Sequence, residues 1–269
     1  PWDVYMDWYA ELTKLCLECL TDDGHLFLLN YPKQNSHLRV KYIESPYPNI
    51  AEKLNSSKYI EQGDVAEYVW IYNSNIGMNK HKFTTSHRSI LHLTKSKKAL
   101  LNKGNWWFPY KNPKSIIQRK RDKEVLNGNN IEEAEKKARE YVELNGRMSY
   151  SWITKAELDS SFLREGGGAM YYDLVKNVSA DKTFHPCQIP TKLVDGLIQA
   201  STDIDDNVFI LFGGSGSELL VANKIGRKFT SCEIYDKYHK MIVERLAVEE
   251  DVLLKKFKLN HNNIKTKSH

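Results

Sequence analysis

A glycine-rich segment near the carboxyl end holds the residues best suited to binding chemistry. It reads Phe-Gly-Gly-Ser-Gly over residues 212–216 and completes an apolar run, Asn207–Phe212, that is typical of a buried strand. Without side chains, a ligand can approach the backbone there, and the N-terminus of the next predicted helix, Leu219–Ile225, attracts phosphate and other polar groups. The strand predicted after it, Lys228–Glu233, ends in an acid, and such an acid accepts hydrogen bonds from ribose hydroxyls in nucleotide-binding proteins. The pattern predicts a nucleotide-type ligand, with a tight turn of an unrelated α/β protein as the alternative.

The elements around this segment predict a βαβ unit preceded by further helices and strands. Helical periodicity covers Pro190–Thr202 before the unit and Tyr235–Val248 after it. The front third predicts a helix, Met6–Leu20, then strands at His25–Asn30, Glu67–Asn73 and Ser89–Thr94. Apolar strands that alternate with helices indicate an α/β fold with a largely parallel sheet.

The middle of the chain has a different character. Residues 97–172 contain one long periodic pattern, the charged helix Ile131–Leu144. A basic stretch, Lys95–Lys123, overlaps this region and contains a cluster of aromatic residues. Basic residues interleaved with aromatics suit phosphate contacts and base stacking on a nucleic acid, whereas a solvated charged face is the alternative.

Composition and charge narrow the class of protein. The 269 residues are 41% hydrophobic and 27% charged, with a formal net charge of +5 and a mean hydropathy of −0.56. This is ordinary globular composition, and no apolar run approaches the roughly 18 residues of a membrane helix. Four cysteines are too few for a disulfide scaffold, which indicates a reducing, cytoplasmic location. Cys16 and Cys19 lie within a predicted helix, where buried packing is the favoured role, so no metal site is expected.

Residues 182–246 resemble the C-terminal signature of the β-group amino DNA methyltransferases, which act on adenine N6 or cytosine N4. In that family a His-Pro-x-Gln-x-Pro segment and a helix precede the cofactor strand. Phe-x-Gly-x-Gly, a helix, Gly-Arg and a strand ending in Glu follow. The matching residues here are His185, Pro186, Gln188, Pro190, Phe212, Gly214, Gly216, Gly226, Arg227 and Glu233. The front of the chain, residues 2–30, also resembles the helix and strand that follow the family's catalytic loop.

The resemblance implies a fold and an order of parts. The fold would be Rossmann-like and doubly wound, a mostly parallel sheet with one antiparallel edge strand, as in class I methyltransferases. The parts would be circularly permuted, with the target-base half at residues 1–96, a target-recognition insertion at 97–172 and the cofactor-binding half at 173–269.

The resemblance also implies a cofactor and partners. S-adenosylmethionine would bind here, and double-stranded DNA would be the substrate, with the target base flipped out of the duplex. A second copy of the chain or a cognate restriction subunit is a further candidate partner, and a membrane is not. The residues implied in cofactor binding are His185, Pro186, Gln188, Phe212, Gly213, Gly214, Ser215, Gly216 and Glu233.

Three departures from the family pattern keep alternatives open. Ile210 stands where the family usually has Asp, Ile189 where it often has Lys, and Glu218 where Thr is common. Adenine N6 methylation is the favoured activity. The alternatives are cytosine N4 methylation, a cofactor-impaired relative that only binds DNA, and methylation of RNA or protein.

The family's catalytic loop, a polar or acidic residue followed by Pro-Pro and an aromatic, does not occur in the sequence. Because the first residue is Pro1 and not Met, we expect chain upstream of it. Pro1-Trp2 is either the end of that loop, with Trp2 as the stacking aromatic, or part of the segment after it. The spacing from Tyr5 to Leu20 favours the second reading, so no catalytic residue is assigned.

Overall fold

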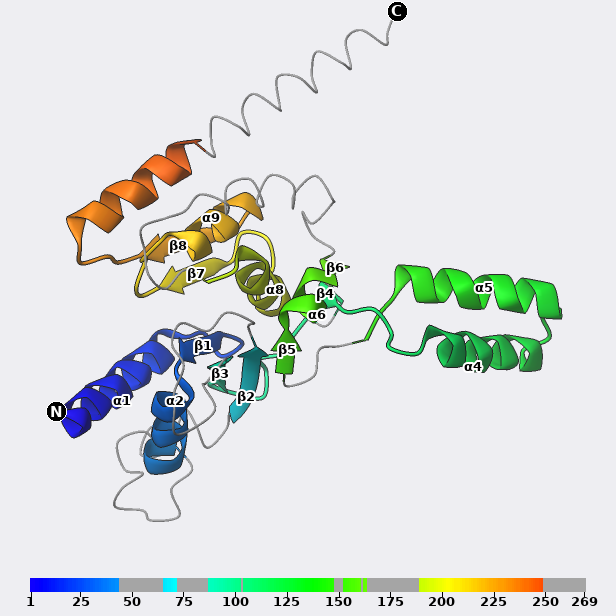
Figure 1. The fold of residues 1–269 in the computed structure, drawn as a ribbon, viewed down its shortest axis with the longest axis horizontal. Coiled ribbons are helices and arrows are strands. Elements are labelled where there is room, and N and C mark those ends of the chain that lie inside the picture. Colours follow the sequence, from blue (N-terminus) through cyan, green and yellow to red (C-terminus); the bar gives the residue numbers. More distant parts are fainter. Residues whose placement is uncertain are drawn as a thin grey trace, which may run out of the picture. The chain divides into compact units, whose positions relative to one another are not determined.

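The protein divides into two compact units (Figure 1). A computed structural model describes residues 1–43, 65–71, 87–102, 104–147, 152–160, 162–163 and 189–248. Unit 1 comprises Pro1–Lys103 and Trp107–Phe162, and unit 2 comprises Gly104–Trp106 and Leu163–His269. Each unit has its own apolar cluster and its own strands.

Unit 1 is built on a four-stranded sheet whose order is β1-β3-β2-β5. Its strand β3 runs antiparallel to β1 and β2, whereas β5 runs parallel to β2. The expected mixed sheet is therefore confirmed. The strands are β1 (His25–Asn30), β2 (Val65–Ile71), β3 (His87–Thr94) and β5 (Trp152–Thr154).

The antiparallel strand lies one place in from the edge of this sheet, which corrects the expectation of an antiparallel edge strand. Among the described strands, β1 takes the edge and β3 is paired on both sides. Residues 89–94 of β3 are all buried, so both faces of the strand are covered. An apolar strand without a solvated face is better placed inside a sheet than at its edge.

Helices α1 (Trp2–Cys19) and α2 (Pro32–Leu38) pack on this sheet, and the π-helical turn η1 (Arg39–Ile43) continues α2. The buried residues of α1 recur at helical spacing and face the same apolar cluster as the strand residues Leu91 and Leu93. Polar contacts reinforce the packing, because the buried Asn35 donates to the Leu28 carbonyl oxygen at 2.9 Å. The cluster contains Met6, Tyr9, Ala10, Leu17, Leu38, Ile43, Leu91 and Leu93.

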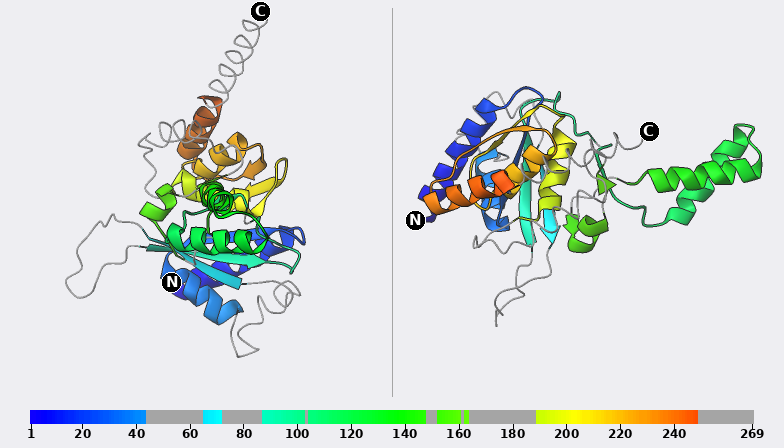
Figure 2. Two further views of the ribbon diagram at one scale, coloured as in Figure 1. Left: turned by 90° about the vertical axis from the view of Figure 1, so that its right-hand side faces the viewer. Right: turned by 90° about the horizontal axis from the view of Figure 1, so that it is seen from above.

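The later part of unit 1 contains a helical hairpin. Helices α4 (Pro113–Leu126) and α5 (Ile131–Leu144) lie side by side, and a turn at residues 127–130 joins them (Figures 1 and 2). Asn112 and Asn130 cap the two helix N-termini, each accepting a backbone hydrogen bond from three residues ahead. The helix α6 (Lys155–Ser160) follows β5, and the two-residue strands β4 (Trp106–Trp107) and β6 (Phe162–Leu163) pair with each other.

Unit 2 contains the expected βαβ arrangement. The strands β7 (Asn207–Ile210) and β8 (Lys228–Ser231) are parallel, and α9 (Ser217–Lys224) connects them. Helix α8 (Thr191–Ser201) precedes β7, and a further helix begins at residue 236 and is described to residue 248. The apolar cluster of this unit comprises Val194, Ile198, Val221, Ala222 and Ile225, with Ile189, Val208 and Phe229 packed against it.

The buried side chain of Arg227 links the ends of α8 and α9 through hydrogen bonds. Its guanidinium donates to the carbonyl oxygens of Ile225 at 2.8 Å and Thr202 at 2.7 Å. These carbonyl groups follow the ends of α9 and α8, where backbone acceptors lack partners within the helix. The Gly-Arg pair therefore has a structural role, because it closes two helix ends beside β8.

Two expectations from the sequence are corrected. Helix α4 was not expected, because its apolar residues do not follow one helical face, although Asn112-Pro113 is a typical helix start. The prediction that the two cysteines are buried is wrong for Cys19, which is exposed, and Cys16 is only half-buried.

Among the described helices, none is long and apolar enough to span a bilayer.

Candidate functional site

A pocket with a volume of about 350 Å³ lies in unit 2 beside the glycine-rich segment. Its walls come from the segment after β7, the first turn of α9 and the segment after β8. Ligands of α/β proteins bind at this place, outside the carboxyl ends of parallel strands. The lining residues are Ile189, Phe212, Gly213, Gly214, Ser215, Glu218, Glu233, Ile234, Tyr235 and Tyr238.

Glu233 lies at the pocket wall, two residues after β8 ends, and backbone groups hold its carboxylate. Its Oε2 accepts a hydrogen bond from the Gly214 N–H at 2.8 Å, and its Oε1 accepts one from the Tyr235 N–H at 2.9 Å. Two backbone N–H groups therefore fix the direction of this carboxylate at the pocket. The site thus has a fixed acceptor at the position predicted for a ribose contact.

The shape of the glycine segment depends on a close neighbour, Ile242 of the helix after β8. Gly216 has a φ of 76°, and a Cβ at this residue would lie 3.0 Å from Cγ1 of Ile242. At Gly213 a Cβ would lie 2.8 Å from Cδ1 of the same side chain. Arg245, one turn further along that helix, donates to the carbonyl oxygen of Ser215. The helix at residues 236–248 therefore packs against the glycine segment and holds its backbone in place.

Glu218 is a second carboxylate at the pocket. It lies in the first turn of α9, where the positive end of the helix dipole favours an anion. Burial raises the pKa of Glu218, and the attraction of Arg245 opposes that rise. A half-buried carboxylate that lines a pocket suits a cationic group of a ligand. The sequence marked Glu218 only as a departure from the family pattern, and its place directly after the glycines is the signal that could have identified it.

The residues predicted to bind a cofactor fall into three groups according to their position relative to the pocket. Gly216 caps α9 next to the pocket and does not line it. His185, Pro186 and Gln188 lie outside the described residues. The predicted residues that the structure brings together around the pocket are Phe212, Gly213, Gly214, Ser215 and Glu233.

Trp2 lies in the first turn of α1 and packs against the apolar cluster of unit 1. Its ring meets the His37 ring edge-on, with 5.7 Å between the centroids, and the Lys33 ammonium lies 4.1 Å from its centroid. A ring held in this way contributes to the core of its own unit.

Two residues of the aromatic cluster in the basic stretch belong to the buried core. Trp106 is 6% exposed and Phe108 is 1% exposed, so base stacking on these two side chains is wrong. Some lysines of the stretch also have structural partners. Lys95 donates to the Leu20 carbonyl oxygen at 2.9 Å, and Lys98 pairs with Asp22 at 3.2 Å. Only part of the predicted DNA-binding stretch is therefore available to a nucleic acid.

A sequence model of a DNA methylase family, N6_N4_Mtase, matches residues 2–244. The chain belongs to this DNA methylase family. Among known proteins, the methylase is 25% identical over 223 residues to the Type II methyltransferase M1.MboII of Moraxella bovis. That match covers 82% of the methylase and 72% of its relative.

Other relatives match over smaller shares of their own length. The methylase is 25% identical to M.BamHI of Bacillus amyloliquefaciens, covering 86% of the methylase and 43% of that protein. It is 35% identical over 78 residues to M.ScaI of Streptomyces caespitosus, covering 29% of the methylase and 26% of that protein.

A solved structure shares the fold. The PvuII DNA methyltransferase, which is named as cytosine-N4-specific, superposes with a TM-score of 0.53 at 15% identity. The likeness covers 90% of the methylase and 70% of that chain, and it confirms the expected α/β fold of class I methyltransferases.

Proposed function

We propose that this methylase transfers a methyl group from S-adenosylmethionine to an exocyclic amine of double-stranded DNA, with adenine N6 as the favoured acceptor. The observation that carries the proposal is the position of the Glu233 carboxylate, which the backbone N–H groups of Gly214 and Tyr235 hold at the wall of the pocket. We assign residues 173–269 to cofactor binding, 1–96 to the target base and 97–172 to target recognition.

The residues of the pocket fit the chemical groups of S-adenosylmethionine. Glu233 would accept hydrogen bonds from the ribose hydroxyls, and Glu218 would face the ammonium group of the methionine end. The backbone of residues 213–215 would bind the methionine carboxylate. The apolar side chains of Phe212 and Ile234 would cover the adenine ring, while resemblance assigns His185, Pro186 and Gln188 to the same cofactor.

The methylase would act mainly by holding two reactants in line. When bound, S-adenosylmethionine supplies a methyl group activated by the positive sulfur. The pocket fixes the cofactor, and the apolar side chains of Ile189, Phe212 and Ile234 limit the water near it. Alignment and exclusion of water are the main requirements for a displacement of this kind. We assign no residue to the target amine.

Methylation of cytosine N4 is the second candidate activity. It is favoured by the fold likeness to the PvuII DNA methyltransferase, which is named as cytosine-N4-specific. Duplex DNA incubated with the protein and S-adenosylmethionine, then digested to nucleosides, distinguishes the two by mass. N6-methyldeoxyadenosine supports the adenine assignment, and N4-methyldeoxycytidine overturns it.

A cofactor-impaired relative that only binds DNA is the third candidate. Ile210 ends β7, and Ile189 lines the pocket, so neither provides the charged group that the family pattern has at these two positions. A folded protein that binds duplex DNA but not S-adenosylmethionine would establish this candidate and exclude transferase activity for the chain.

Calorimetric titration with S-adenosylmethionine tests the assignment of Glu233. We expect saturable binding that Glu233→Ala weakens on the order of 5- to 150-fold, because a buried polar contact contributes about 1–3 kcal/mol. Glu244→Ala is the matched control, since Glu244 is an exposed acid of the same unit and does not line the pocket. Equal affinities for Glu233→Ala and the control, with both variants folded, would refute the ribose contact.

A further inference from the structure

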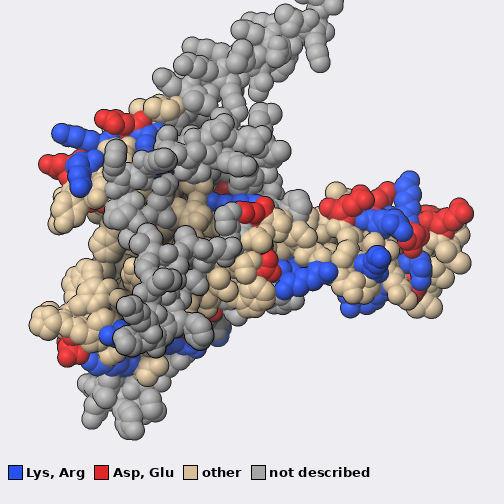
Figure 3. Space-filling view, viewed as in Figure 1, with Lys and Arg blue, Asp and Glu red and all other residues tan. Residues whose placement is uncertain are grey.

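The hairpin of α4 and α5 has a two-sided charge distribution. Helix α4 carries five Lys and Arg against two Asp and Glu, whereas α5 carries three against five. The helices pack through Ala134 and Ala138, which are buried, and through Arg121, which pairs with Glu135 at 3.7 Å. In Figure 3, acidic and basic side chains stand side by side along the upper edge of the hairpin, whereas basic side chains predominate along its lower edge.

The cations of the two helices also differ in their partners. On α5, Lys137 pairs with Glu133 at 2.9 Å and Arg139 pairs with Glu135 at 2.7 Å. On α4, Arg119 and Lys123 are exposed, and neither forms an ion pair with any described residue. Spaced four residues apart, these two cations project from the same face of α4. This face is a positive ridge whose charges are not neutralised within the described hairpin.

We propose that the Arg119–Lys123 face of α4 contacts the phosphate backbone of duplex DNA. The two residues are separated by about 6 Å along the helix, and a DNA strand carries one phosphate per about 3.4 Å of duplex axis, so the face can reach neighbouring phosphates. This positive face suits the phosphate backbone, because a cation that contacts a DNA phosphate releases a counterion condensed on the DNA. The proposal rests on the proposed function, since it names the surface that holds the substrate.

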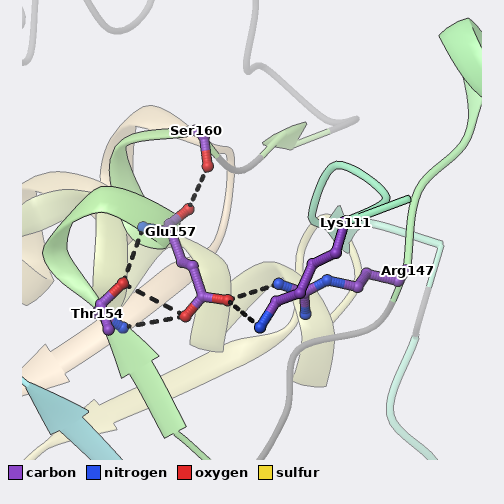
Figure 4. A network of polar contacts seen from close by, with 5 residues as sticks. All are labelled: Lys111, Arg147, Thr154, Glu157 and Ser160. Carbon is purple, nitrogen blue, oxygen red and sulfur yellow. Dashed lines mark hydrogen bonds and ion pairs between the residues drawn. The ribbon is translucent and has the colours of Figure 1, made fainter. Parts of the chain in front are cut away.

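The root of the hairpin is built to hold its direction relative to the rest of unit 1. Glu157 of α6 pairs with Arg147 at 2.6 Å and with Lys111 at 3.8 Å (Figure 4). In the sequence, Lys111 lies just before α4 and Arg147 just after α5, so both mark the ends of the hairpin. Phe108 and Arg147 exchange two backbone hydrogen bonds of 2.8 and 2.9 Å at the same root. A rigid support is what a phosphate-contacting element needs, because a fixed geometry lowers the entropy cost of binding.

The test compares two double variants that each remove two helical cations. Arg119→Gln with Lys123→Gln neutralises the proposed face, and Lys137→Gln with Arg139→Gln is the matched control on α5. Glutamine has a helix propensity close to that of Lys and Arg, so both variants should keep the hairpin folded. Affinity for a fluorescent 30-base-pair duplex is measured by anisotropy between 50 and 300 mM salt.

We expect the α4 variant to lose affinity roughly sixtyfold at 0.1 M salt and to reduce the slope of log affinity against log salt by about 1.8, two contacts at about 0.9 each. The α5 variant should bind nearly as the unmodified protein does. Equal losses in both variants, or no loss in the α4 variant, would overturn the proposal. A loss seen equally with duplex RNA, or traced to self-association by sedimentation, would overturn duplex DNA as the partner.

Binding of S-adenosylmethionine to the same variants separates this proposal from the proposed function. We expect both double variants to bind the cofactor as the unmodified protein does, because Arg119 and Lys123 belong to unit 1 and the pocket belongs to unit 2. If the unmodified protein bound DNA through α4 but no cofactor, methyl transfer would fail and the α4 surface would stand.

Discussion

At the scale of single residues, Glu218 distinguishes this pocket from a general nucleotide site. Glu233 is oriented by two backbone N–H groups, whereas Glu218 lies in the first turn of α9 and is attracted by Arg245. The two carboxylates therefore suit different ligand groups. Glu233 can accept from hydroxyls, and Glu218 can pair with a cation.

We predict that Glu218→Gln weakens binding of S-adenosylmethionine about tenfold, because a charge-assisted hydrogen bond is replaced by a neutral one. The same variant should bind 5′-methylthioadenosine, which lacks the methionine ammonium group, with unchanged affinity. Calorimetry with both ligands checks the prediction.

Glu233→Gln is the control for Glu218→Gln, since the two ligands share the ribose. That variant should weaken both ligands to a similar extent. A Glu218→Gln effect of equal size on both ligands would contradict the assignment of Glu218 to the methionine end.

At this scale, local chain order was enough to predict that the glycine segment and Glu233 lie close together. The turn needs backbone freedom, and the acid follows the next strand, β8, by two residues. Ile242 and Arg245 were not identified as the support of the loop, because that role depends on how a later helix packs against it.

At the scale of elements, the start of α6 shows how one side chain can do two structural tasks. Thr154 and Glu157 form a reciprocal cap, in which the Glu157 N–H donates to Thr154 Oγ1 at 3.1 Å and the Thr154 N–H donates to Glu157 Oε2 at 3.4 Å. The other carboxylate oxygen binds Arg147. The cap of α6 and the root of the hairpin therefore share one carboxylate.

We predict that Glu157→Gln lowers the free energy of unfolding by about 2 kcal/mol, because it weakens a helix cap and removes the ion pair between Glu157 and the mostly buried Arg147. For a unit of this size the melting temperature should fall by roughly 4–8 °C. Urea denaturation and calorimetry measure the two quantities.

Glu140→Gln on α5 is the control for Glu157→Gln, since Glu140 is exposed and forms no ion pair with any described residue. It should change the free energy of unfolding by less than about 0.5 kcal/mol. Similar effects of the two substitutions would contradict the structural role of Glu157.

Element prediction failed for α4, and the reason is physical. Helices of the core, such as α1, show one apolar face because they pack against a sheet. Helix α4 packs mainly on α5, so no α4 residue is fully buried and the apolar periodicity is weak. A hairpin of two mutually supporting helices is therefore harder to recognise than a helix on a core.

At the scale of the whole molecule, the stability of the chain should depend on pH through a chain of polar rings in unit 1. His25 Nδ1 lies 2.9 Å from His92 Nε2, and the Tyr68 hydroxyl lies 3.0 Å from His92 Nδ1. Burial lowers the pKa of His25, although a backbone hydrogen bond and the charge of Asp23 oppose this effect.

An unfolded histidine has a pKa of about 6.5, so below that pH the unfolded chain binds a proton that folded His25 resists. We therefore expect the free energy of unfolding to fall as the pH drops from 7 through the folded pKa of His25. Urea denaturation at pH 7.5, 6.5 and 5.5 measures this slope.

His25→Gln should reduce the slope, whereas His239→Gln, at an exposed position of unit 2, should leave it unchanged. The same slope in the unmodified protein and in His25→Gln would show that protonation of His25 does not govern the loss.

The amino-acid sequence by itself determined the βαβ order in unit 2, the strands β1, β2 and β3, and the family likeness, because periodicity and motif spacing are properties of chain order. The tertiary structure alone decided that β3 lies inside its sheet and that Trp106 and Phe108 are buried. It also left Arg119 and Lys123 exposed. Burial and proximity depend on contacts between distant parts of the chain, and no local pattern encodes them.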